Sequence, residues 1–310
     1  MAKKRTPTAV VSFYRFVDIA QPDRVCAGLQ KLCDGQPLLG TVLVAREGFN
    51  GTLAGTRQSV QAVFEWLQDE LQLEQKIDGR WTEATEPPFR RMRVRVKNEI
   101  VTLGRPDIQP QKHTGQHVLA AEWNRLIADP DTLLIDARNH YEIELGSFPG
   151  AVDPQTDSFR QFSRFAVELA AGDRDRTVAM FCTGGIRCEK ASALMQELGF
   201  SKVYQLQGGI LNYLETVAAE DNRWQGECFV FDTRVAVDRD LAEGGYVQCH
   251  ACRRPLSSED LESPDYRDGV SCPKCINELE ADRVARLEER RRQVALARQR
   301  GEIHIGARHD

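Results

Sequence analysis

Apolar and polar residues alternate or recur at helical spacing through the first hundred positions of the chain. The pattern predicts strands over Val10–Val17 and Gly40–Arg46, and a helix that begins at Pro22-Asp23. A second helix, from about Ser59 to Leu71, carries four apolar residues on one face: Val60, Val63, Phe64 and Leu67. A last strand pair is expected between Met92 and Leu103.

A turn signal lies within this stretch. Asn50-Gly51 stands between Gly48-Phe49 and Thr52-Leu53, and it predicts a tight hairpin because both central turn positions need a positive φ. The resulting order of elements, βαββαβ, is the ferredoxin-like α+β plan. We therefore expect an N-terminal domain over residues 1–104.

The pattern changes after residue 104. Residues 105–116 include two prolines and few apolar groups, as a linker does. The runs Leu133-Leu134-Ile135 and Val178–Phe181 that follow are apolar without alternation, which is typical of strands covered on both faces. Helical patterns separate them, so residues 117–222 predict an α/β domain with a parallel sheet.

Two short segments complete the chain. Residues 223–276 form a small cysteine-containing module, and residues 277–310 a basic tail. From Asn277 to Arg300 the tail predicts one amphipathic helix, with apolar residues spaced among arginines. These apolar residues are Leu279, Val284, Leu287, Val294 and Leu296.

Composition narrows the class of protein. The chain has 310 residues and 41% apolar residues, enough for two or three domains with their own cores. No apolar segment of signal-peptide length follows the N-terminus, and no run of eighteen apolar residues occurs, so we expect a soluble cytoplasmic protein without a membrane partner. The cytosol keeps thiols reduced, and the nine cysteines therefore favour metal binding or catalysis over disulfides.

Charge is distributed unevenly around a formal net charge of −5. Residues 1–112 have 17 basic and 13 acidic side chains, residues 113–280 have 16 and 28, and residues 281–310 have 8 and 5. Because a polyanion responds to the local field, basic ends allow a nucleic-acid partner in spite of the acidic average.

One cysteine lies in a loop suited to nucleophilic catalysis. A buried strand ends at Cys182, and Thr183, Gly184, Gly185 and Ile186 lead to a helix that begins near Arg187. Inward amides, the helix N-terminus and the guanidinium of Arg187 all favour the thiolate, so Cys182 and Arg187 are the candidate catalytic residues. The alternative is a small buried hydrophobic residue. Cys188 is either a resolving thiol or, as we favour, a packed residue turned away from the loop.

Four further cysteines have metal-ligand spacing. Cys249, Cys252, Cys272 and Cys275 give C-x₂-C-x₁₉-C-x₂-C, which predicts a structural zinc site with four thiolates. Such a site would stabilise a module too small for a core of its own. A redox or metal-free set of thiols is the alternative.

A basic segment lies near residue 90. Five basic residues and no acidic one occur between residues 89 and 97, and on a strand most of them share one face. They are candidates for phosphate contacts with RNA, or simply a solvated face. The five are Arg90, Arg91, Arg93, Arg95 and Lys97.

Residues 115–220 resemble a rhodanese domain. The resemblance is carried by the Cys182 loop and by four earlier stretches: Leu134-Ile135-Asp136-Ala137-Arg138, Glu142, Gly146 and Pro149-Gly150-Ala151. Four residues separate Cys182 from Arg187, as in the sulfur-sized rhodanese loop, whereas the related phosphatases have one more. The resemblance implies that Asp136, Arg138 and Glu142 form an ion network that organises the domain.

Residues 8–276 as a whole resemble the tRNA uridine(34) hydroxylase family, which has an acylphosphatase-like N-terminal domain. Glu47–Thr52 and Glu227–Asp232 carry this resemblance on either side of the rhodanese-like centre. Phe49 departs from the smaller aliphatic residue expected there. The resemblance implies an α/β multidomain protein: a ferredoxin-like domain, a rhodanese domain and a small Cys-rich, zinc-ribbon-like module with a C-terminal helix.

The same resemblance implies an oxidoreductase that uses the loop cysteine and molecular oxygen to convert the tRNA wobble uridine to 5-hydroxyuridine. Its partner would be the tRNA anticodon arm, with no obligate protein partner evident and no flavin, haem or nucleotide motif in the sequence. A C6 adduct with uracil and a persulfide on Cys182 are both open as intermediates. A rhodanese-type sulfurtransferase is the alternative activity, and an RNA-binding scaffold without activity is a third interpretation, which the intact Cys182 and Arg187 disfavour.

Overall fold

The computed structural model describes residues 8–84, 88–172 and 174–300. They form two compact units, one up to Gly226 and one from Glu227 onward. The first unit contains a five-stranded, a four-stranded and a two-stranded sheet, and the second contains two two-stranded hairpins, two α-helices and a short 3-10 helix.

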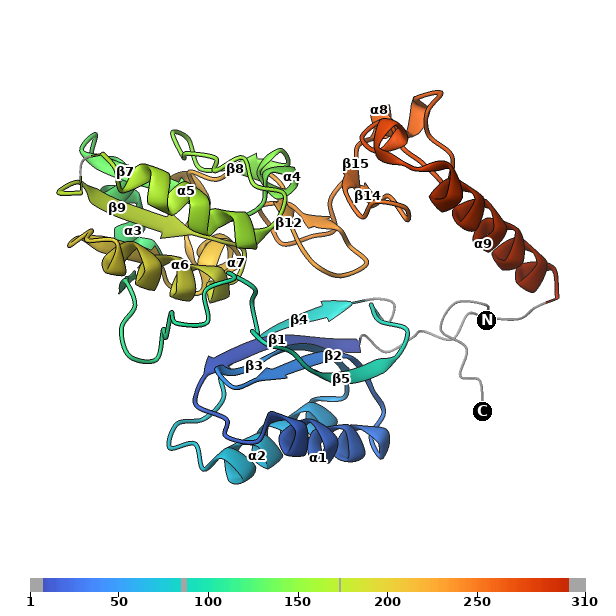
Figure 1. Ribbon diagram of the computed structural model, residues 1–310, viewed down its shortest axis with the longest axis horizontal. Helices are drawn as coiled ribbons and strands as arrows, with labels where there is room; N and C mark the ends of the chain where they lie inside the picture. Colours follow the sequence, from blue (N-terminus) through green and yellow to red (C-terminus); the bar gives the residue numbers. More distant parts are fainter. Residues whose placement is uncertain (1–7, 85–87, 173, 301–310) are drawn as a thin grey trace. The chain divides into compact units, whose positions relative to one another are not determined.

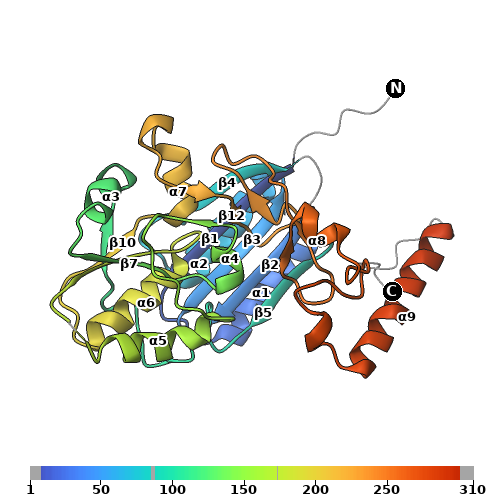
Figure 2. The same cartoon turned by 90° about the horizontal axis from the view of Figure 1, so that it is seen from above.

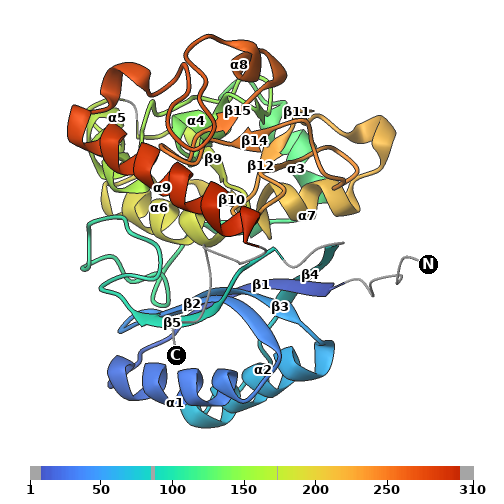
Figure 3. The same cartoon turned by 90° about the vertical axis from the view of Figure 1, so that its right-hand side faces the viewer.

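The N-terminal sheet has the strand order β4-β1-β3-β2-β5. Helices α1 and α2 cover one of its faces (Figures 1 and 3). Its elements are β1 (Thr8–Phe16), α1 (Pro22–Asp34), β2 (Leu38–Ala45), β3 (Gly48–Gly55), α2 (Arg57–Leu71), β4 (Gly79–Ala84) and β5 (Met92–Val96). The pairing is antiparallel except between β2 and β5. The ferredoxin-like plan is confirmed, with β5 added as a fifth strand at one edge.

Side chains from the helices and from alternate strand positions build the core of this domain. Val11 and Phe13 of β1 are buried together with the predicted apolar face of α2. That helix begins at Thr56, whose hydroxyl oxygen accepts a hydrogen bond from the Ser59 N–H. Because side chains alternate along a strand, Tyr14 of β1 lies on the sheet face opposite to Phe13.

The predicted hairpin at Asn50-Gly51 is wrong. Both residues lie inside β3, and the chain turns at Arg46-Glu47 between Ala45 of β2 and Gly48 of β3. A Cβ at Gly51 would lie 2.9 Å from the Phe13 ring, so this glycine serves close packing and not a turn.

The strand pair predicted between Met92 and Leu103 is also wrong. Only one strand, β5, forms between these residues. It pairs with β2 and not with a neighbouring strand of the same segment. After β5 the chain bends at Glu99, whose carboxylate accepts hydrogen bonds from the amides of Leu103 and Gly104, 3.0 Å each. Because this carboxylate accepts two backbone hydrogen bonds, it stabilises a loop here and not a second strand.

The second sheet is parallel, with the order β6-β10-β9-β7, and confirms the α/β prediction. Helices α3 and α7 cover one face and α5 and α6 the other (Figure 2). The elements are β6 (Gln116–Val118), α3 (Ala120–Ile127), β7 (Thr132–Asp136), α4 (His140–Ile143), β8 (Gly146–Ser147), α5 (Phe162–Leu169), β9 (Thr177–Phe181), α6 (Ile186–Glu197), β10 (Val203–Leu206), α7 (Gly209–Thr216) and β11 (Gln225–Gly226).

The second unit is small and loop-rich. Its elements are β12 (Cys228–Phe229), β13 (Ala236–Val237), β14 (Val247–Gln248), β15 (Pro255–Leu256), α8 (Ser258–Glu262) and α9 (Ala281–Gln299). The predicted tail helix forms over α9, and residues 301–310 of the predicted tail lie outside the described residues. Among the helices that the structure describes, none is long and apolar enough to cross a membrane.

Candidate functional site

Cys182 directly follows β9, at the edge where the parallel strands end. Asp136 ends the neighbouring strand β7, and its register partner on β9 is Phe181. Ligands of parallel α/β sheets bind at this carboxyl edge because the loops and helix N-termini converge there. The Cys182 side chain is fully buried, and Thr183 beside it is 8% exposed.

The loop after Cys182 holds the sulfur with backbone amides. The N–H of Gly185 donates to the Cys182 Sγ over 3.2 Å. Gly185 has a φ of 95°, in the region that favours glycine, and α6 begins at the next residue. From the other side, the amides of Ile210 and Leu211 in α7 donate to the carbonyl oxygens of Cys182 and Thr183, at 2.9 and 3.1 Å.

These surroundings favour the thiolate. Burial by itself raises the pKa of Cys182, but hydrogen bonds from the Cys188 thiol and from the Arg187 and Cys188 amides, together with the Arg187 charge, lower it to about 6. A thiol with this pKa is mostly ionised at neutral pH, and the thiolate is the nucleophilic form.

Cys188 is a packed residue of α6, as expected, but the expectation that it turns away from the loop is wrong. Its thiol hydrogen-bonds the Cys182 sulfur, and burial raises the pKa of Cys188 well above the ordinary value, with the Cys182 thiolate adding to the effect. Cys188 is therefore the protonated donor of the pair.

Arg187 is anchored by an acidic partner. Its two terminal nitrogens donate to the Glu142 carboxylate at 2.6 and 2.8 Å, and one also donates to the Thr183 hydroxyl at 3.1 Å. Glu142 also accepts a hydrogen bond from the Asn139 N–H, in a capping box at the start of α4. Arg187 thus supplies positive charge next to the sulfur while its orientation is fixed.

Asp136 and Arg138 form a separate ion pair without solvent contact. The Arg138 guanidinium donates to both Asp136 oxygens, at 2.9 and 2.6 Å, and also to the Gly146 carbonyl. It fastens the end of β7 to β8, which agrees with the organising role that the resemblance implied for these two residues.

Lys190 joins the two domains of the first unit, and sequence reasoning missed it. Its fully buried ammonium donates to Glu47 at 2.7 Å and to Glu99 at 2.5 Å. Glu47 lies in the β2–β3 turn, within the stretch Glu47–Thr52 that carried the family resemblance. The only sequence signal was that stretch, since a lysine on a helix is ordinarily a surface residue.

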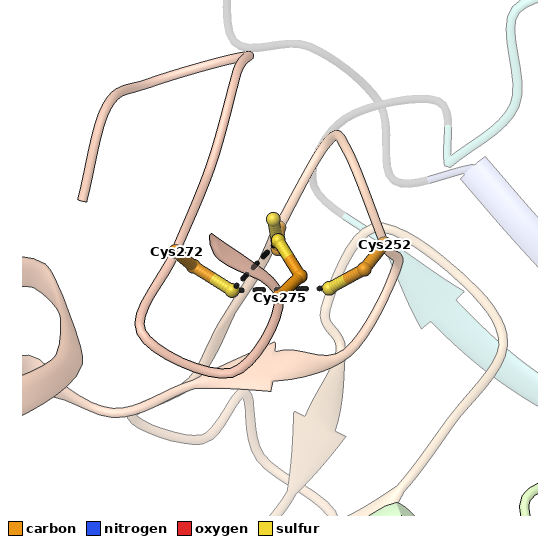
Figure 4. A group of neighbouring side chains, drawn as sticks. Cys252, Cys272 and Cys275 are labelled. Atoms are coloured by element: carbon orange, nitrogen blue, oxygen red, sulfur yellow. Dashed lines mark hydrogen bonds between the residues drawn. The ribbon is translucent and has the colours of Figure 1, made fainter. Parts of the chain in front are cut away.

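The four cysteines of the second unit come together. The sulfurs of Cys249, Cys252, Cys272 and Cys275 all lie within 4.8 Å of one another. Those of Cys252 and Cys275 lie 3.8 and 3.5 Å from Cys272, along the dashed lines of Figure 4. A tetrahedral zinc site with Zn–S bonds of 2.3 Å has sulfurs about 3.8 Å apart. The thiols therefore fit a metal ion such as zinc.

The basic segment forms an edge of the N-terminal sheet. Arg93 and Arg95 lie on β5, with Arg90, Arg91 and Lys97 beside it, and all but the half-buried Arg93 are exposed. A cavity of about 570 Å³ opens next to the end of this strand, lined among others by Arg46 and Lys97. The role of these residues stays a prediction.

The two domains of the first unit define a class of protein in which an acylphosphatase-like domain precedes a rhodanese-like domain. The family model described as "UPF0176 acylphosphatase like domain" matches residues 8–100, and the model described as "Rhodanese-like domain" matches residues 119–216. Both lie inside the predicted domains, whose boundaries stay predictions.

Proteins that match nearly the whole length of the chain identify its family within this class. A "tRNA uridine(34) hydroxylase" of Teredinibacter turnerae is 46% identical over 97% of this chain and 94% of its own length. One of Gluconobacter oxydans is 47% identical over 97% of each chain. The chain belongs to the tRNA uridine(34) hydroxylase family.

Proposed function

We propose that this protein hydroxylates C5 of the wobble uridine of tRNA to 5-hydroxyuridine, with molecular oxygen as cosubstrate and Cys182 as nucleophile. The observation that carries the proposal is a buried cysteine whose pKa is lowered to about 6, in a chain that matches tRNA uridine(34) hydroxylases over nearly its whole length. A cytoplasmic site of action, where thiols stay reduced, is part of the proposal.

The proposed chemistry begins with addition of the thiolate to C6 of uracil. The S–C6 bond forms, and the C5–C6 π electrons move toward C5 and the C4 carbonyl. C5 becomes electron-rich, and its carbanion adds to molecular oxygen to give a C5 hydroperoxide after protonation. A two-electron donor from solution, such as a small thiol, cleaves the O–O bond: one oxygen stays on C5 as the hydroxyl and the other leaves as water. Loss of the C5 proton and departure of the thiolate from C6 restore the ring and free Cys182.

The loop residues have supporting roles in this step. The N–H of Gly185 and the charge of Arg187 stabilise the sulfur as thiolate before addition and again on its departure. Glu142 keeps Arg187 oriented. Thr183, Gly184 and Ile186 complete the loop.

We propose that the basic edge of the N-terminal sheet binds the anticodon arm. Arg90, Arg91, Arg95 and Lys97 are exposed there, and phosphate contacts by such side chains provide most of the sequence-independent affinity for RNA. We also propose zinc for the four-cysteine site. Four thiolates leave no open coordination position, so the metal would stabilise the second unit and take no part in the reaction.

Nucleoside mass spectrometry tests the proposed function. tRNA is incubated in air and in the presence of a small-thiol reductant with the native protein, with Cys182→Ser, and with the matched control Cys26→Ser in α1. We expect 5-hydroxyuridine from the native protein and from the control, and none from Cys182→Ser. The absence of product with all three proteins, or its presence with Cys182→Ser, would refute the proposal.

A rhodanese-type sulfurtransferase is the second candidate, because a low-pKa cysteine in this loop also suits a persulfide. Trapping separates the two intermediates. An outer sulfur released from Cys182 by mild reduction indicates the persulfide, and a stable adduct with RNA that contains 5-fluorouridine indicates attack at C6. Turnover of thiosulfate without 5-hydroxyuridine would favour the sulfurtransferase.

A further inference from the structure

Tyr14 connects the N-terminal domain to the cysteine loop. It lies on β1, and its hydroxyl donates to Glu189 Oε1 at 3.2 Å, in the first turn of α6. A Cβ atom built at Gly185 would lie 3.0 Å from the same hydroxyl oxygen. The tyrosine hydroxyl therefore occupies the space next to the loop glycine, where a Cβ atom would crowd it, and hydrogen-bonds the helix that the glycine starts.

Gly185 is the residue through which Tyr14 can act on the sulfur. Its N–H donates to the Cys182 Sγ, and its carbonyl oxygen accepts the Glu189 N–H at 3.3 Å. A small rotation of this peptide would redirect the N–H, because hydrogen bonds weaken steeply away from linearity. The orientation of Gly185 thus helps to set how strongly the thiolate is stabilised.

Glu189 is a fixed anionic acceptor for the tyrosine. His117 Nε2 lies 3.0 Å from Oε1, and Thr114 and Gln205 each donate to Oε2 at 3.1 Å. Burial raises the pKa of Glu189, but these hydrogen bonds and the His117 charge outweigh it and lower the pKa below its ordinary value. Burial, followed by the charges of Glu189 and Cys182, raises the pKa of Tyr14, so its hydroxyl keeps the proton that it donates.

We propose that Tyr14 is a positioning residue of the cysteine site: its hydroxyl, anchored on Glu189, holds the Gly185 turn so that the Gly185 N–H points at the Cys182 sulfur. The proposal rests on the proposed function of Cys182 as nucleophile. It makes the N-terminal domain part of the active site, in addition to its proposed contact with RNA.

The substitution Tyr14→Phe tests this role in the full-length protein, since it keeps the ring and removes one oxygen atom. Thiolate absorbance at 240 nm is titrated against pH, and the curve of the corresponding Cys182→Ser protein is subtracted to isolate Cys182. The titratable groups that face Cys182 are Arg187 and Cys188 from its own loop and helix and Tyr14 from β1. We expect the thiolate midpoint to move to higher pH.

Turnover gives the second measurement. We expect kcat at pH 7 to fall on the order of tenfold, as for the loss of one hydrogen bond to a charged group, with the KM for tRNA unchanged. The control is Ser12→Ala, on the same strand and face, whose hydroxyl pairs with Thr52 at 3.1 Å. It should match the native protein in midpoint, kcat and KM.

A double-mutant cycle tests whether Tyr14 acts through Glu189. In a Glu189→Gln background, Tyr14→Phe should change the midpoint and kcat far less than in the native background. A lower melting temperature with native midpoint and kcat would overturn the proposal, because the hydroxyl would then only hold the domains together. A change confined to KM would also overturn it. The thiol titration needs no tRNA. If the native protein makes no 5-hydroxyuridine, the proposed function is refuted, but the effect of Tyr14→Phe on the thiolate midpoint can still be interpreted.

Discussion

At the scale of single residues, the stabilisation of the Cys182 thiolate is shared among several donors. Arg187 is already paired with Glu142, and the negative charge of this carboxylate offsets part of the effect of the guanidinium on the sulfur. Of the groups that lower the pKa of Cys182, the Cys188 thiol contributes more than the Arg187 charge. Hydrogen bonds that point directly at the sulfur therefore matter at least as much as the nearby cation.

The pH dependence of thiol reactivity follows from this environment. Because the Cys182 pKa is lowered to about 6, its thiolate fraction is nearly complete at pH 7 and is lost as the pH falls through about 6. The rate of tRNA hydroxylation should therefore rise through this pH range and level off above it. A midpoint near the ordinary cysteine value of 9 would contradict the assignment. Cys188→Ala should move the midpoint upward, and the control Cys26→Ser, at a half-buried position in α1, should not.

The sequence predicted the Cys182 loop but not the orientation of Cys188. The strand before Cys182, the glycines of the loop and the N-terminus of the following helix could be predicted from the local sequence pattern. The inward direction of the Gly185 amide could be predicted in the same way. Cys188 is the third residue of α6, and helical side chains lean toward the helix N-terminus, so its thiol reaches back to the loop. Helical spacing alone, without this tilt of the side chains, places the Cys188 thiol on the side of the helix away from the loop.

At the scale of helices and strands, long-range contacts determined the elements that local sequence patterns did not predict. The N-terminal helices and the buried parallel strands were predictable from their apolar periodicity. Strand β4 was not, since its residues are half-exposed and polar and apolar types do not alternate. Asn50-Gly51 has the composition of a turn, yet close packing on Phe13 and the pairing of β3 between β1 and β2 make it a strand.

The interaction between α6 and the β2–β3 turn should be essential for stability. Lys190→Met leaves the Glu47 and Glu99 carboxylates buried without their cation, which typically costs about 3–5 kcal/mol. Chemical denaturation should show this loss in the unfolding free energy of the first unit. Lys202→Met, at an exposed position, is the control and should change the free energy by less than about 0.5 kcal/mol. Equal stability of the two variants would mean that the Lys190 cluster does not hold α6.

Metal removal should affect the second unit selectively. One buried cluster of this unit is built around the four cysteines, so a zinc chelator should unfold the segment that they hold together. Hydrogen exchange should then rise in residues 249–275 and stay unchanged in the parallel sheet. Elemental analysis should find about one zinc per chain in the native protein and in Cys26→Ser, and a loss of zinc in Cys272→Ser. Full zinc content in Cys272→Ser would contradict the assigned ligands.

At the scale of the whole molecule, the proposed function depends on segments far apart in the sequence. Cys182, the proposed nucleophile, belongs to the rhodanese-like domain, whereas Tyr14, Glu47 and the basic edge belong to the N-terminal domain. The acidic average of the chain hides this division, because acidic residues concentrate between residues 113 and 280. RNA affinity should therefore follow the local charge of the N-terminal domain and not the net charge.

Salt dependence of tRNA binding tests the basic edge. Each phosphate contact that is lost should lower the slope of log K against log salt concentration by about 0.7–0.9, so removing two contacts in Arg95→Ala/Lys97→Ala should lower it by about 1.5. Filter binding of unmodified tRNA at several salt concentrations measures the slope. The control Arg164→Ala removes an exposed arginine of α5 that pairs with Glu168, and its slope should equal that of the native protein. A native slope in the double variant would exclude phosphate contacts at these two positions. A lower slope combined with an unchanged kcat at saturating tRNA would show that these side chains bind the RNA backbone and leave the reaction at Cys182 unaffected.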